Sequence, residues 1–133
     1  MLVMFVAPSA AVEVAFPAET ANMVIARTVA AAVAARADLT VDQIEDVRLA
    51  IDEAIAYLIA HAQADARVRA QLWVDESTFH AALTCTTDAP SPPKPEEFSE
   101  TVLTALVGEV DRDVLDGDLT IHWSLNRDHS VSA

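Results

Sequence analysis

Residues 40–62 read TVDQIEDVRLAIDEAIAYLIAHA and predict a long amphipathic helix. Thr40 can cap its first turn, and Gln43 then completes a capping box. An apolar stripe follows at helical spacing and consists of Ile44, Val47, Ile51, Ile55, Leu58 and Ala62. A second stripe lies nearly opposite and consists of Asp46, Leu49, Glu53, Tyr57 and Ala60. The first stripe is predicted to face the core, and the second contains the candidate functional residues.

The segments around this helix predict an α+β fold. Residues 12–16 alternate as a strand that Pro17 ends, and an alanine-rich helix is expected from about residue 19 to 36. Two alternating runs, 68–74 and 79–85, have the pattern of an antiparallel hairpin. A loop with four prolines follows, then a helix capped by Ser99 that includes Val110, and a last strand over 119–125. This order predicts a two-layer α/β sandwich with a mainly antiparallel sheet and helices on one face.

Length and composition favour one soluble domain. The 133 residues are 53 % hydrophobic, but no apolar run approaches the roughly 20 residues that cross a bilayer, so no membrane association is expected. We expect the domain over residues 11–128, between a loose or edge strand in residues 1–10 and a tail in residues 129–133. The first residues lack a basic leader, and the single cysteine fits a reducing compartment. The expected location is cytoplasmic.

The charge of the chain indicates which classes of partner it can bind. The net charge is −13, with seven arginines and one lysine that form no cluster. Phosphate backbones would be repelled, so no direct nucleic-acid binding is expected. An acidic surface of this size suits a basic protein partner, although it can also serve solubility alone.

The sequence also predicts which way individual side chains point. In the first helix, Ile25, Val29, Ala32 and Val33 are predicted to face the core, with Arg27 nearly opposite beside Met23, Ala31 and Ala34. Cys85 falls on a core-facing alternation, as do Phe79, Leu83 and Trp123. Trp73 falls on the other side of its strand and is a candidate for partner contact. The four histidines have no metal-ligand spacing, so no metal site is expected.

The order of motifs resembles that of a known family. Asn22-Met-Val-Ile-Ala-Arg27, Arg48-Leu-Ala-Ile-Asp-Glu53-Ala and Val102-Leu-Thr-Ala-Leu-Val-Gly-Glu-Val110 stand in the order found in anti-sigma factor serine kinases of the RsbW and SpoIIAB type. These proteins belong to the GHKL (Bergerat-fold) ATPase superfamily. The resemblance spans residues 11 to about 127 and implies the GHKL ATPase fold and a homodimer.

The resemblance also implies a nucleotide chemistry, which this sequence retains in part. In active members the helix glutamate is the general base, matched by Glu53, and an asparagine four residues on holds magnesium. Tyr57 stands there and offers no amide carbonyl. The aspartate that reads adenine is matched by Asp88, but the glycines that let the backbone approach the nucleotide are replaced by Ala-Pro-Ser-Pro. A degenerate site is therefore expected, with Glu53 either a vestigial base or an ordinary helix carboxylate and Asp88 an ordinary loop residue.

Three functions are compatible with this pattern. The first is an anti-sigma factor or partner-switching regulator that binds a sigma factor, an anti-anti-sigma factor or both, with little or no kinase activity and no cofactor. The second is an active serine kinase that uses Mg-ATP to phosphorylate an anti-anti-sigma factor, and the missing glycines weigh against it. The third is an adaptor of the same fold with another protein partner. The family uses an arginine matched by Arg27 for its partner contacts, so Arg27, Met23 and Trp73 are the candidate contact residues.

Overall fold

The computed structural model describes residues 7–129, which form one five-stranded sheet and three α-helices. The strands are β1 (Val12–Pro17), β2 (Arg67–Asp75), β3 (Thr78–Thr86), β4 (Val110–Leu115) and β5 (Asp118–Asn126). The helices are α1 (Met23–Ala34), α2 (Val41–His61) and α3 (Glu97–Val107), with short 3-10 turns at Thr20–Asn22 and Ala35–Ala37. The predicted strand at the very start of the chain falls largely on residues 1–6, outside the described residues.

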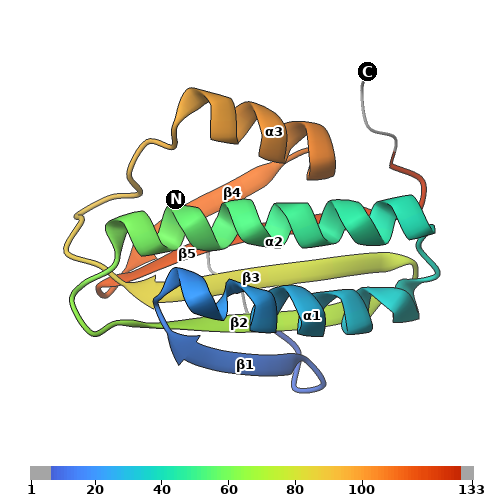
Figure 1. The fold of residues 1–133 in the computed structure, drawn as a ribbon, viewed down its shortest axis with the longest axis horizontal. Helices are drawn as coiled ribbons and strands as arrows, with labels where there is room; N and C mark the ends of the chain where they lie inside the picture. Colours follow the sequence, from blue (N-terminus) through green and yellow to red (C-terminus); the bar gives the residue numbers. More distant parts are fainter. Residues whose placement is uncertain (1–6, 130–133) are drawn as a thin grey trace.

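The helices and the sheet form two layers. The strand order is β1-β2-β3-β5-β4, and every neighbouring pair is antiparallel. All three helices lie on one face of the sheet, with α2 between α1 and α3 (Figure 1). This arrangement confirms the predicted two-layer α+β sandwich. No helix in residues 7–129 is long and apolar enough to span a bilayer.

Helix α2 begins as its sequence predicts. The Thr40 hydroxyl accepts from the backbone N–H of Gln43, and the Gln43 side chain accepts from the backbone N–H of Thr40, which closes the capping box. The Gln43 amide also donates to the carbonyls of Arg127 at 2.8 Å and His129 at 3.2 Å. One buried glutamine thus ties the start of α2 to the end of the sheet.

The core lies between α2 and the inner face of the sheet. Val47, Ile51, Ile55 and Leu58 of the predicted apolar stripe are fully buried. They meet alternate residues of the central strands, including Phe79, Leu83 and Trp123, and the Phe79 and Trp123 ring centroids are 5.8 Å apart. Burial raises the pKa of the Cys85 thiol to about 11, and its sulfur donates to the Leu58 carbonyl. The predicted hairpin register and the inward cysteine are confirmed.

The structure differs from the prediction between α3 and β5. The prediction gave a helix that includes Val110 and then one strand, but residues 110–115 form the edge strand β4, and α3 ends at Val107. Arg112 points to the helix side between Val110 and Val114, in register with Ile121. An inward arginine breaks the apolar alternation that identifies a strand, so the pattern did not indicate one.

Two details of the helices also differ from expectation. Ser99 is not the cap of α3: the N-cap position is Glu96, and Ser99 lies within the first turn. In α1 the buried residues are Ala26, Ala30, Ala31, Val33 and Ala34, whereas Ile25 is 44 % exposed and Ala32 is exposed. Small alanines let α1 approach α2 closely, so the contacting side follows the alanines rather than the larger residues.

Candidate functional site

Tyr57 lies on the second stripe of α2, where the helix meets β4 and the segment between β3 and α3. Its hydroxyl donates to the Pro93 carbonyl at 2.6 Å, in the segment between β3 and α3. The Arg112 guanidinium of β4 lies over its ring, with Cζ 4.7 Å from the centroid, and the His61 ring meets it edge-on at 5.2 Å. The residue is 9 % exposed, and burial raises the pKa of its phenol. Tyr57 therefore fills the space beside α2 and keeps its proton.

Arg112 connects this tyrosine to α3. Its two terminal nitrogens donate to the two carboxylate oxygens of Glu100 at 2.8 and 3.0 Å, a bidentate ion pair. The ion pair thus holds the guanidinium over the Tyr57 ring, within the distance of a cation–π contact. Arg112 is not among the site residues that the sequence predicts, although a lone arginine at the inward position of Val110-x-Arg112-x-Val114 is a usable signal.

Glu53 lies one turn before Tyr57 and is engaged by α3. The Ser99 hydroxyl donates to its Oε2, and both side chains are half-buried. The carboxylate of the predicted general base therefore accepts from a helix-borne hydroxyl. Ser99 therefore links α3 to Glu53 of α2, whereas the sequence predicted it only as a helix cap.

Asp88 lies apart from Glu53 and Tyr57, in the loop that follows β3. It is exposed, and its Oδ1 accepts from the Gln63 side chain at 2.6 Å. The adjacent Thr87 is buried, and its hydroxyl donates to the His61 carbonyl at 2.7 Å. The loop is therefore fastened to the end of α2 at Thr87 and again at Pro93.

A cavity of about 320 Å³ opens beside Tyr57, between the last turns of α2 and the start of α3. Its lining combines Ala56, Tyr57, Ala60 and His61 of α2 with Lys94, Pro95, Glu96 and Ser99. This volume is at the lower end for ligand sites. Among residues 7–129, no group of three or more histidine, cysteine, aspartate or glutamate side chains could hold a metal ion.

The sequence predicts that Arg27 points outward from α1, but in the structure its side chain contacts α2. Its Nε donates to Asp52 Oδ1 of α2 at 3.0 Å, and the two side chains are 34 % and 30 % exposed. Met23 is half-buried against the core, and Ala31 and Ala34 are buried, so those three do not form an open surface with Arg27. Val24, 52 % exposed, and Ile25 supply the exposed apolar side chains of α1 instead.

Trp73 lies on the opposite face of the sheet, as predicted. Its ring is stacked on His80 of β3, with centroids 5.0 Å apart and planes within 4°, and lies 6.1 Å from His122 of β5. Burial lowers the pKa of both histidines. The candidate contact residues Arg27 and Trp73 are thus on opposite faces and cannot serve one small interface.

The chain matches known proteins over most of its length. The model of the family described as the histidine kinase-like ATPase domain matches residues 16–113. Two curated relatives, both named anti-sigma-F factor RsbW, come from Mycobacterium tuberculosis strains CDC 1551 / Oshkosh and ATCC 25618 / H37Rv. Each is 36 % identical over 102 residues, which cover 75 % of this chain and 60 % of the relative. The chain therefore matches these relatives over about three fifths of their length.

Proposed function

The chain belongs to the histidine kinase-like ATPase domain family, and we propose that it acts as an anti-sigma factor or partner-switching regulator with little or no kinase activity. Its partner is a sigma factor, an anti-anti-sigma factor or both, and it acts as a homodimer. The relatives named anti-sigma-F factor RsbW support the class of partner. The observation that carries the loss of kinase activity is the position of Tyr57.

Tyr57 is incompatible with a magnesium ion held beside Glu53. A hard cation takes oxygen ligands such as amide carbonyls and carboxylates, whereas a protonated phenol already donating to Pro93 is a poor ligand. Arg112 over the ring adds a positive charge at the same place. The side chains beside α2 therefore do not fit Mg-ATP.

The segment between β3 and α3 is equally unsuited to phosphate. Phosphates are bound by backbone N–H groups at glycine-rich turns and helix N-termini. The four prolines at 90, 92, 93 and 95 carry no N–H, and the exposed Glu97 brings negative charge to the first turn of α3. A triphosphate would meet repulsion where the fold normally offers donors.

Protein recognition then falls to the helical layer. Asp52 fixes Arg27 through its Nε, so the terminal nitrogens of the guanidinium stay available for charge-assisted hydrogen bonds. Val24, three residues earlier on the same side of α1, is an exposed apolar neighbour of Arg27. Arginine is enriched among the residues that dominate binding at the centres of protein interfaces.

The test is binding to purified sigma factors from the native organism, measured by calorimetry with and without Mg-ATP. We expect one sigma factor to bind at micromolar affinity or tighter, with the same affinity in both conditions. Incorporation of labelled phosphate into a co-purified antagonist would instead establish the kinase. Binding to none of the sigma factors or their antagonists would leave the adaptor as the better assignment.

A further inference from the structure

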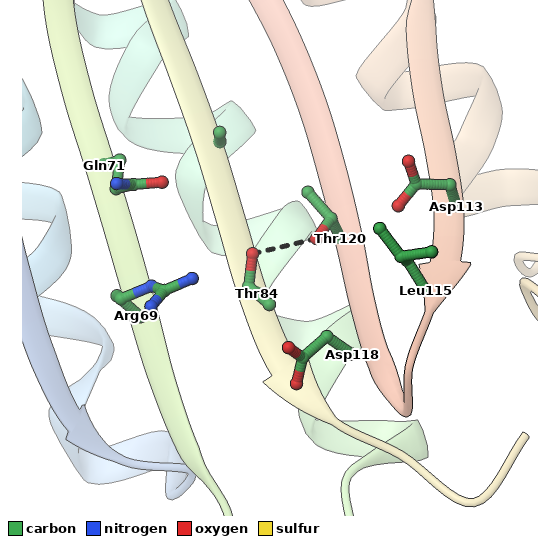
Figure 2. A pocket seen from close by; sticks show the side chains of 8 residues that line it. Arg69, Gln71, Thr84, Asp113, Leu115, Asp118 and Thr120 are labelled. Carbon is green, nitrogen blue, oxygen red and sulfur yellow. Dashed lines mark hydrogen bonds between the residues drawn. The ribbon is translucent and has the colours of Figure 1, made fainter. Parts of the chain in front are cut away.

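The Ser99 hydroxyl is paired with a carboxylate at the edge of the cavity beside α2. It donates to Glu53 Oε2, and among residues 7–129 it is the one serine, threonine or tyrosine hydroxyl that donates to a carboxylate. The Thr84 and Thr120 hydroxyls, on the other face of the sheet, hydrogen-bond to each other at 2.9 Å (Figure 2). A carboxylate that accepts from a serine can take its proton when the serine oxygen attacks a carbon, which is how a base activates a nucleophile.

This pair opens onto a cavity that can admit a small molecule. Ser99 lines the cavity of about 320 Å³, whereas Glu53 is not among the lining residues. Ala56, Ala60 and Pro95 supply an apolar wall. Ligand sites are mostly apolar hollows with a few polar groups in fixed positions. A small organic molecule can therefore reach the Ser99 oxygen without displacing the carboxylate that accepts its proton.

The surroundings of Ser99 favour a negative charge that develops during a reaction. Attack on a carbonyl carbon places such a charge on the carbonyl oxygen. Ser99 is the third residue of α3, and the first N–H groups of a helix have no acceptor within it. The cap residue Glu96 makes no side-chain bond to them among the described residues. Lys94 on the cavity wall adds the ammonium of the single lysine in the chain. These donors and this charge stabilise an oxyanion beside Ser99.

The charges around the cavity select a neutral substrate. Glu96 lines the cavity, the exposed Glu97 follows it, and Glu53 holds Ser99, so a free carboxylate or a phosphate ester meets repulsion. A neutral ester does not. Its attack by Ser99 also leaves the total charge of the site unchanged, because Glu53 becomes neutral as the oxyanion forms.

We propose that Ser99 is a nucleophile that accepts the acyl group of small neutral carboxylic esters, with Glu53 as its general base. The Ser99 Oγ attacks the carbonyl carbon while its proton passes to Glu53 Oε2. The bond from that carbon to the alkoxy oxygen then breaks, and the alcohol leaves with the proton from Glu53. The acyl group stays on Ser99 as an ester, and no oxidant, reductant or further reactant is needed. This activity goes beyond the proposed function, because neither a sigma factor nor its antagonist takes part.

The test is incubation of the whole chain with p-nitrophenyl acetate, followed by nitrophenolate release and by peptide mass spectrometry. We expect one acetyl group per chain, on Ser99. Ser99→Ala should lose this label, and Glu53→Gln should slow its formation roughly 100-fold, because an amide cannot take the proton. Ala60→Leu narrows the cavity without changing either reacting group and should slow acetylation roughly 10-fold, because the ester is positioned less well.

Ser91→Ala removes an exposed serine from the segment between β3 and α3 and is the matched control. It should be acetylated at the rate of the parent, and melting curves should show that all four variants are folded. A parent that carries no acetyl group, or carries it on Lys94 or the terminal amine instead of Ser99, overturns the proposal. So does a Ser99→Ala variant labelled like the parent, or a Glu53→Gln variant that reacts at the parent's rate. The peptide map of the parent decides the acceptor without any variant.

Discussion

Arg27 of α1 donates its Nε to Asp52 of α2 at 3.0 Å, and the pair joins the two helices at the surface that we propose for partner binding. Both side chains are about one third exposed, so the pair contributes at most about 1 kcal/mol to folding. Its main consequence is orientation. A long side chain held at Nε has lost much of the entropy that binding would otherwise cost.

The first prediction concerns this pair. Arg27→Ala should weaken a bound sigma factor or antagonist roughly 30-fold, because a central arginine is worth about 2 kcal/mol at an interface. Asp52→Asn should weaken it by less, since the guanidinium remains but is no longer fixed by a carboxylate. Both are measured by calorimetry, with Arg36→Ala as the control. If Arg27→Ala binds like the parent, the contact surface lies elsewhere.

The second prediction concerns Tyr57 and nucleotide. Tyr57→Phe removes the bond to the Pro93 carbonyl and should lower the free energy of unfolding by about 1 kcal/mol. Millimolar Mg-ATP should leave the melting temperature of the parent and of Tyr57→Asn nearly unchanged, because a free asparagine amide does not restore the missing phosphate donors. A rise of several degrees in the parent would show that the pocket accepts nucleotide.

The third prediction concerns the sheet register. Phe79, Leu83 and Trp123 are fully buried or nearly so, and alanine at any of them should cost about 3 kcal/mol or more. Thr84→Ala should cost less than about 1 kcal/mol, since Thr84 is half-buried and the Thr120 hydroxyl can bond to water instead. Urea unfolding at one protein concentration provides the comparison. Equal losses at Leu83 and Thr84 would be incompatible with the observed pairing.

The fourth prediction concerns pH. Burial lowers the pKa of His80 and of His122 below the ordinary 6.5, so the folded state binds their protons less readily than the unfolded chain. Their contribution to stability is therefore complete above about pH 6.5 and is lost as the pH falls through the folded pKa values. The raised pKa values of Asp46 and Asp113 act nearer their ordinary value of 3.8 and in the opposite direction.

Replacing both histidines with glutamine should flatten the loss of stability between neutral pH and pH 5, as followed by urea unfolding at each pH. Each single replacement should remove part of the slope. An unchanged slope in the double variant would assign the pH dependence to other groups.

The sequence alone determined the helices and strands that have unbroken periodicity. The capping box at Thr40 and Gln43, the apolar stripe of α2 and the β2–β3 hairpin depend on contacts close in the chain, where side-chain spacing fixes the geometry. The α+β class follows from their order, and the histidine kinase-like family match spans most of the same elements. The mismatch at Tyr57 and the missing glycines are also properties of the sequence itself.

The tertiary structure decided every relationship between residues distant in the chain. Arg112 lies 55 positions after Tyr57, so no local pattern links them. The sequence pattern did not predict the edge strand β4, because Arg112 interrupts its apolar alternation. This inward arginine is tolerated only because Glu100 of α3 forms an ion pair with it. The contacting side of α1 followed its alanines, because close approach to α2 outweighs the size of Ile25. Likewise, Arg69 of β2 and Asp113 of β4 lie in one row across the sheet only because β5 lies between β3 and β4. Pairing across a sheet is set by the whole fold, and one chain position says nothing of its neighbour two strands away.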